Sequence, residues 1–201
     1  MIMKSQFVWL LCGLALLGCS GEPKPAAEIP VPVAKAETPE PVTETTADGE
    51  KSEPYEASVG GFNFRVPADW KEQPPKSQFV LGEFSIPGEG GPARLTISSA
   101  GGGIEANIER WRGQFTREAG DPEPRETEIL FGLQKGTLVE LAGTYTDMFS
   151  GGKPNQVWRM LGVAVPMGPT NVFVKMTGPA ATVVQRRDEF VKFVESARGE
   201  K

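Results

Sequence analysis

The feature that most limits what this chain can fold into is a change of composition near residue 54. Residues 20–54 contain seven of the 18 prolines, eight acidic residues and three lysines, and no aromatic residue. Such a segment cannot bury enough apolar surface to offset the conformational entropy lost on folding. We therefore predict a disordered Pro/Glu-rich linker over residues 19–54 and one globular domain over residues 55–201, which is long enough for its own core.

A short apolar run precedes the linker. Residues 7–17 read FVWLLCGLALL and follow the positive charge of Lys4. The run is shorter than the roughly 20 residues that span a bilayer, and its length is typical of the apolar region of a signal peptide. It ends in a motif that resembles a bacterial lipobox, Leu16-Leu17-Gly18-Cys19.

The lipobox resemblance implies a lipoprotein signal peptide over residues 1–18, cleavage after Gly18 and acylation of Cys19. Cys19 would carry a thioether-linked diacylglycerol and an amide-linked third chain, with fatty acids such as palmitate. Because two or more acyl chains give lasting attachment, we expect the membrane to be a partner through Cys19. Two other interpretations stay open: a plain secretory signal that happens to contain a cysteine, and an uncleaved short anchor.

The predicted anchor sets the expected location. We expect a cell-envelope protein that is lipid-anchored and faces the periplasm, with the linker holding the domain away from the membrane. Ser20 stands where many enteric lipoproteins retained at the inner membrane carry an aspartate. This favours the outer membrane over the inner membrane.

The predicted domain contains neither histidine nor cysteine, and this limits its possible chemistry. The chain has no histidine, and its two cysteines, Cys12 and Cys19, lie within the first 19 residues. This excludes Ser-His-Asp and Cys-His catalysis, and metal sites that need imidazole or thiolate ligands in the domain. The net charge of −5 comes without a block of like charges, so no nucleic-acid partner is expected. We predict no metal, no cofactor, no catalytic residue and no enzyme activity.

The domain alternates between strand and helix patterns. Side chains of alternating polarity predict two short strands about the turn Gly60-Gly61. Similar patterns and intervening turns predict further strands over residues 78–86, 93–99, 127–146 (two strands), 155–166 and 170–178. Because sequential strands joined by short turns form antiparallel sheets, we predict an α+β fold: a mainly antiparallel sheet flanked by two helices.

The first predicted helix lies within residues 104–120. Apolar residues at spacings of four, three and four form one face: Ile104, Ile108, Trp111 and Phe115. Gly120 and Pro122 are expected to end this helix. The second predicted helix begins near Pro179, and its apolar face is interrupted by Arg187.

Three segments carry a family resemblance. GFNFRVPADW, GGGIEANIERWRGQF and NVFVKMTGP resemble the Mog1/PsbP-like fold group, and are most similar to uncharacterised lipid-anchored bacterial proteins with a G-G-x-x-x-N-x-x-R-W-x-x-Q segment. That segment is here Gly102-Gly103, Asn107, Arg110-Trp111 and Gln114. The resemblance implies an antiparallel sheet with helices on its faces, and it implies no reaction.

A polar strip is the first candidate binding site. Asn107, Arg110 and Gln114 lie at i, i+3 and i+7, beside the apolar face of the first predicted helix. Such a strip can hydrogen-bond a carboxylate, a sugar or a peptide, with Arg110 as the charged anchor. The alternative is that Asn107 and Gln114 satisfy nearby backbone groups while Arg110 covers the edge of Trp111.

Two segments have weaker claims to a site. The glycines of SSAGGGIEAN precede a helix, where free N–H groups can hold an anion. The segment lacks the G-x-x-x-x-G-K-[ST] pattern and a nearby lysine, so we favour a chain-reversing turn. TDMFSGGKPNQ can be a binding loop with Met148 and Phe149 as apolar contacts, or an exposed hairpin tip.

Acidic and aromatic residues complete the candidates. Glycoside hydrolysis needs two acids that lie close together. The candidate acids are Glu126, Glu128, Glu140 and Asp147, and nothing in their spacing predicts that they converge. The tryptophans Trp70, Trp111 and Trp158 are expected in the core rather than in a carbohydrate platform.

These observations predict a lipid-anchored envelope protein with a non-catalytic binding or assembly domain. Its partner would be another envelope protein or a glycan. The alternative is a carboxylate-dependent hydrolase or a small-ligand receptor tethered in the periplasm. A converging acid pair beside a pocket would favour that alternative.

Overall fold

The computed structural model of the chain describes residues 53–147 and 151–200. The predicted signal peptide and Cys19, nearly all of the linker, and Met148 and Phe149 lie outside the described residues. Within them, no helix is long and apolar enough to cross a membrane.

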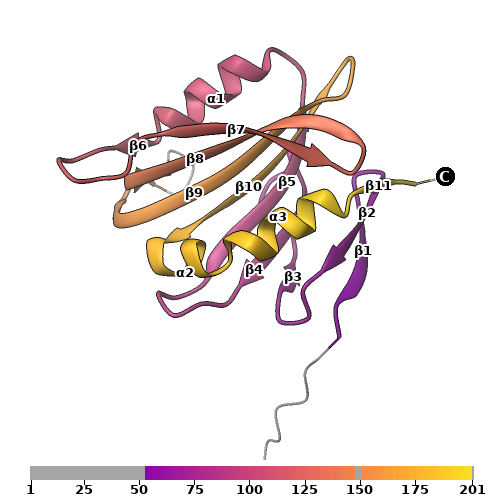
Figure 1. Cartoon of the computed structure of the whole chain (residues 1–201), viewed down its shortest axis with the longest axis horizontal. Helices are drawn as coiled ribbons and strands as arrows, with labels where there is room; N and C mark the ends of the chain where they lie inside the picture. Colours follow the sequence, from indigo (N-terminus) through magenta and orange to yellow (C-terminus); the bar gives the residue numbers. More distant parts are fainter. Residues whose placement is uncertain (1–52, 148–150, 201) are drawn as a thin grey trace, which may run out of the picture. The chain divides into compact units, whose positions relative to one another are not determined.

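A large sheet forms the centre of the domain (Figure 1), and every strand pair in the described residues is antiparallel. Its strands follow the order β3-β4-β5-β10-β9-β8, and two strands, β6 and β7, pair with opposite ends of β8. The bounds are β3 Lys71–Gln73, β4 Val80–Ile86, β5 Ala93–Ala100, β6 Phe115–Thr116, β7 Arg125–Phe131, β8 Gln134–Thr146, β9 Pro154–Pro166 and β10 Asn171–Pro179.

The remaining elements cover the two faces of this sheet. A small sheet of order β1-β2-β11 and the helices α2 and α3 contribute to one face, and α1 packs on the other. Figure 1 shows α3 lying between the large sheet and β2, and α1 lying along the β8–β9 side. The bounds are β1 Tyr55–Val59, β2 Phe62–Val66, α1 Ile104–Arg112, α2 Ala180–Gln185, α3 Arg187–Glu195 and β11 Arg198–Gly199.

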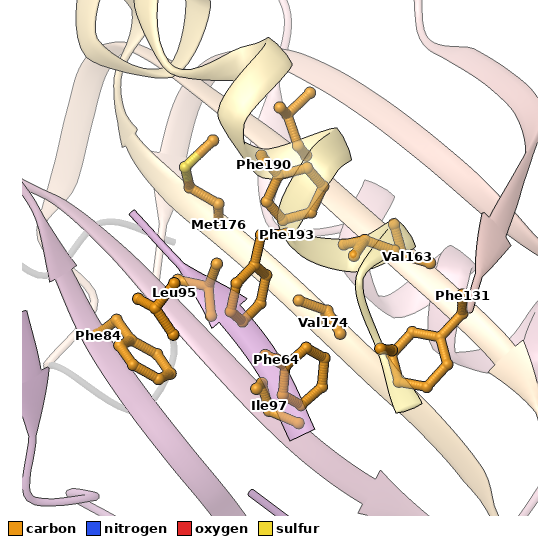
Figure 2. Packing of buried hydrophobic residues seen from close by; sticks show 14 of the residues in the cluster. Phe64, Phe84, Leu95, Ile97, Phe131, Val163, Val174, Met176, Phe190 and Phe193 are labelled. Atoms are coloured by element: carbon orange, nitrogen blue, oxygen red, sulfur yellow. The ribbon is translucent and has the colours of Figure 1, made fainter. Parts of the chain in front are cut away.

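The larger core lies between the large sheet, α3 and the small sheet. Phe193 of α3 is its centre: its ring stacks on Phe64 at 4.7 Å and meets Phe84 edge-on at 5.8 Å. Figure 2 shows Phe190 and Phe193 projecting from α3 toward the strands of the sheet. These rings are almost fully buried, so their packing fixes the C-terminal helix on the sheet.

The second core lies under α1, on the opposite face. Ile108 and Trp111 pack there against side chains of β8, β9 and β10. A Cβ at Gly162 would lie 2.6 Å from Cζ3 of Trp111. The indole therefore lies directly against the backbone of β9, because Gly162 has no side chain.

The predicted α+β class is confirmed: a mainly antiparallel sheet is flanked by helices. The described residues contain three helices rather than two, because the C-terminal helix is interrupted at Arg186. This residue leaves the helical conformation with φ −95° and ψ 5°. Its guanidinium binds Glu189, Asp69 and the carbonyl oxygen of Pro87.

The first predicted helix was too long. It ends at Arg112, with Gly113 as its C-cap, and Gly120 has no part in it. Phe115, which fits the helical spacing, instead begins β6 and packs against Tyr145, with ring centroids 5.1 Å apart. The short strands β3, β6 and β11 were not predicted, because two or three residues show no alternation.

Candidate functional site

The apolar residues under α1 come from β8, β9 and β10, and polar side chains continue this face of the sheet onto β5 and β4. Glu83 pairs with Thr96, and Thr96 pairs with Lys175, in three neighbouring strands. Directly paired residues of antiparallel strands project from the same face. We call the polar residues of this area the Lys175 cluster: Glu83, Arg94, Thr96, Gln114, Tyr145, Lys175 and Thr177.

The strands place these residues by alternation. In β5, Leu95 and Ile97 enter the large core, so Arg94 and Thr96 face the other way. In β10, Val174 and Met176 likewise enter the core and leave Lys175 and Thr177 in the cluster. The large core thus determines which polar groups meet on the opposite face.

Glu83 and Arg94 form a closed ion pair. Nε and Nη2 of Arg94 donate to the two carboxylate oxygens of Glu83, each at 2.7 Å. Glu83 is 2% exposed, and its hydrogen bond from Arg94 lowers its pKa despite burial. This bidentate pair uses both oxygens of Glu83, so the charges of Glu83 and Arg94 largely compensate each other.

Lys175 has a different environment. Its partly buried Nζ donates to Oε1 of Gln114 at 3.3 Å and lies 6.0 Å from the centre of the Tyr145 ring. Burial lowers the pKa of Lys175 to about 8, while Asp147 raises it and Arg94 lowers it further. The ammonium group is therefore held in a site that disfavours its charge.

Tyr145 contributes a buried, uncharged side chain to the cluster. Its ring is 5% exposed and stacks on Trp158, with ring centroids 5.4 Å apart and an angle of 2° between the planes. Burial raises the pKa of Tyr145 to about 12. The phenol therefore stays protonated and brings no negative charge to Lys175 in the physiological pH range.

A β-bulge positions the aromatic pair. Gly143 pairs with Trp158 but Tyr145 pairs with Asn155, so two residues of β9, Gln156 and Val157, lie opposite the single residue Thr144 of β8. One of them, Val157, has φ 55° and is 75% exposed. A β-branched residue in the left-handed region is strained, and this strain accompanies the stacking of Trp158 on Tyr145.

The predicted polar strip is divided between two environments. Nδ2 of buried Asn107 donates to the carbonyl oxygen of Gly103 at 3.1 Å, and its Oδ1 accepts from the guanidinium of exposed Arg110. Gln114 lies beyond the end of α1 and is 8% exposed. It bonds to Lys175, which the sequence analysis did not single out; a lysine inside the apolar strand pattern NVFVKMTG was the available signal.

The glycine-rich segment 101–103 serves as a turn. The carbonyl oxygen of Gly102 accepts from Nδ2 of Asn171 at 2.7 Å. Glu105 lies in the first turn of α1, and no side chain caps that helix. The carboxylate of Glu105 opposes anion binding at this end.

Glu126 and Glu128 lie together on β7, whereas Glu140 lies apart from them beside α3. Glu126 and Glu128 line an open groove of about 480 Å³ beside β8, but Glu126 is paired with Arg112 and Glu128 lies 3.0 Å from Nζ of Lys135. Glu140 binds Arg187 at 2.7 Å, which explains the arginine on the apolar face of the C-terminal helix. Each of these carboxylates is therefore paired with a cation rather than with a second acid.

The other candidates are structural. Trp70 and Trp111 are core residues, 1% and 4% exposed, while Trp158 is partly buried. Nε1 of Trp70 donates to Oε2 of Glu189 at 3.2 Å. In the described parts of the chain, no group of three or more Asp, Glu, His or Cys residues is placed to hold a metal ion.

No protein-family profile and no curated protein sequence matches the chain. Solved structures with a similar chain course include cyanobacterial PsbP from Synechocystis, at 12% identity and a TM-score of 0.48, over 74% of this chain and 93% of that one. Another is LpqN of Mycobacterium tuberculosis, described as involved in cell envelope biogenesis, at 14% identity and a TM-score of 0.43, over 77% and 88% of the chains.

A third similar structure comes from Bacteroides thetaiotaomicron, at 11% identity and a TM-score of 0.42. The match covers 70% of this chain and 46% of that protein, so this chain spans less than half of its length. PsbP is a member of the group that the sequence resembles. These likenesses concern the course of the chain alone, and no function is taken from them.

Proposed function

We propose that this protein is a lipid-anchored cell-envelope protein with a non-catalytic binding domain. Its binding surface consists of Arg110 of α1, Gln114 just beyond the end of that helix, and Lys175 of β10. The contact between Nζ of Lys175 and Gln114 carries the proposal, because it joins the predicted polar strip to a partly buried cation. The partner is an envelope protein or glycan.

Binding fits this surface better than catalysis does. The candidate acids on β7 and β8 are held in ion pairs, and Tyr145 keeps its proton. The surface consists of hydrogen-bond donors and acceptors that are already oriented by their neighbours. Such preorganised polar groups give a binding site orientation and specificity.

The anchor is tested by replacing its sulfur. The Cys19→Ala chain should lose incorporated fatty acid and leave the membrane fraction, because the acyl acceptor is gone. Cys12→Ala is the matched control and should behave like the wild type, since Cys12 lies in the predicted signal peptide. Membrane retention and labelling of Cys19→Ala would contradict the proposed anchor.

The binding surface is tested by capture of envelope proteins and glycans on the wild-type chain and on Arg110→Ala. The proposal expects a specific component that Arg110→Ala no longer captures. Arg65→Ala is the control, because Arg65 is an exposed arginine on β2, outside the cluster. Equal capture by all three chains would contradict the assignment of this surface.

A further inference from the structure

Two cations of the proposed binding surface have neutral partners. Nζ of Lys175 donates to the amide oxygen of Gln114, and the guanidinium of Arg110 donates to that of Asn107. Asp147 attracts Lys175 electrostatically, but this attraction is smaller than the effect of burial. The neighbouring Arg94, by contrast, is matched by Glu83.

We infer that Lys175 and Arg110 bind an oxyanion of the ligand, either a carboxylate or a phosphate group. Gln114 positions Lys175 through its hydrogen bond to Nζ. This inference rests on the proposed binding function and names the chemistry of the ligand. Lys175 has two ammonium protons beyond the one given to Gln114, and the guanidinium of Arg110 presents a planar set of donors. Charge-assisted hydrogen bonds from such donors are the strong ones in oxyanion recognition.

The groups around Lys175 balance its positive charge only in part, so an external anion can complete the balance. Glu83 of β4 has both oxygens bound to Arg94, and Tyr145 of β8 stays neutral. Asp147, at the end of β8, acts on Lys175 electrostatically, but burial outweighs it, and Arg94 and Arg110 add to the effect of burial. A bound oxyanion would stabilise the ammonium and raise its pKa.

The site admits the end group of a ligand. Arg110 is exposed and Lys175 is partly exposed, so neither cation is enclosed in the core. The bidentate Glu83–Arg94 pair and the stacked Tyr145–Trp158 pair hold neighbouring side chains of the cluster in place. A preorganised site of this kind loses little conformational entropy on binding.

The test is an NMR pH titration of the full chain in mild detergent, with ¹³C at the lysine Cε atoms. The signal of Lys175 is assigned by its absence in Lys175→Met. Sodium acetate and inorganic phosphate are the probes, and sodium chloride at equal ionic strength is the control. We expect either oxyanion to raise the pKa of Lys175 from about 8 toward the ordinary lysine value, and chloride to leave it unchanged.

The affinity of each variant for phosphate measures how much each cation contributes to oxyanion binding. Lys175→Met should weaken oxyanion binding at least about tenfold, and Arg110→Gln by several-fold, because each removes a charge-assisted hydrogen bond. Lys192→Met is the matched control, since Lys192 is an exposed lysine of α3. A pKa of Lys175 that no oxyanion changes, or wild-type affinity in Lys175→Met, would overturn the inference.

Vesicles separate the two sources of the oxyanion. The Cys19→Ala chain, which lacks the predicted acyl acceptor, is mixed with phosphatidylglycerol or phosphatidylcholine vesicles. Binding to phosphatidylglycerol alone that Lys175→Met abolishes identifies a lipid headgroup. Lys175-dependent binding of acetate or phosphate without vesicle binding identifies a soluble ligand, and absence of both overturns the inference.

The proposed function and this inference fail in different ways. Missing fatty acid on Cys19 would remove the anchor and leave the titration of Lys175 unaffected. Arg110-dependent capture combined with an unresponsive Lys175 would keep the binding surface and remove the oxyanion.

Discussion

Nζ of Lys175 lies 3.3 Å from Oε1 of Gln114, so a strand in the middle of the large sheet is joined to the segment that follows α1. The cost of this arrangement is a cation held where burial lowers its pKa to about 8. Its consequences for stability can be measured.

Lys175→Met should change how stability depends on pH. The pKa of Lys175 is lower in the folded chain than in the unfolded chain, where it is about 10.4. The unfolded state therefore binds more protons between pH 8 and 10, and wild-type stability should rise with pH in this window relative to the variant. Below pH 8 the wild type should carry the full penalty, up to about 3 kcal/mol.

Urea unfolding of both chains from pH 7 to pH 10 measures this difference. The raised pKa of Tyr145 costs stability only above pH 10, and both chains share it. A stability difference that stays constant across the window would show that Lys175 titrates normally.

Gly162→Ala should destabilise the contact between α1 and β9. The added Cβ would lie 2.6 Å from Cζ3 of Trp111, and the buried ring has to move, at a cost of about 1–3 kcal/mol. Gly113→Ala is the control, because Gly113 has φ −63° and a Cβ added there would lie 3.5 Å from its nearest neighbouring atom. Thermal unfolding compares the two, and equal stability would contradict the close packing of Trp111.

Arg186→Leu should destabilise the C-terminal helices. The side chain of Arg186 is 15% exposed and binds Glu189, Asp69 and the carbonyl oxygen of Pro87, so its removal breaks all three contacts. Because the two carboxylates remain accessible to water, we expect a loss of about 1–2 kcal/mol of unfolding free energy. Arg198→Leu removes an arginine that is itself exposed and whose partner Glu56 is exposed, and it should cost less than about 1 kcal/mol. A reversed order would contradict the assigned role of Arg186.

Val157→Asn should stabilise the domain by about 1 kcal/mol. Asparagine tolerates the left-handed conformation that Val157 adopts at φ 55°, and the exposed valine side chain contributes little to the core. Val184→Asn, a change at an exposed valine of α2, should bring no gain. Denaturant unfolding measures both variants, and a loss of stability in Val157→Asn would show that the side chain of Val157 makes a needed contact.

The sheet was predictable from local alternation, but the cluster was not. Phe62, Phe64 and Val66 alternate with polar residues, and they form β2 as expected. Lys175 is surrounded along the chain by apolar residues, and its neighbours Thr96 and Glu83 reach it through the register of β5 and β4. Strand register depends on long-range packing. No local sequence pattern therefore predicts that Lys175, Thr96 and Glu83 lie side by side.

The end of α1 escaped prediction for a related reason. The spacing from Trp111 to Phe115 fits a helix. In the structure, however, Phe115 belongs to β6, where it pairs with Tyr145 of β8 and packs against its ring. Gln114 and Arg110 were predicted to share a helix, but Gln114 lies beyond the end of α1. What the spacing could not supply was the partner of Gln114, which comes from β10.

The pKa of Lys175 in the ligand-free chain tests the central claim most directly. Lysine Cε chemical shifts followed from pH 6 to pH 11, with Lys175→Met for assignment, give this value. We predict a midpoint of about 8 for Lys175. A midpoint near 10.5, the ordinary lysine value, would contradict the claim that the binding surface contains an ammonium group whose charge is disfavoured by burial.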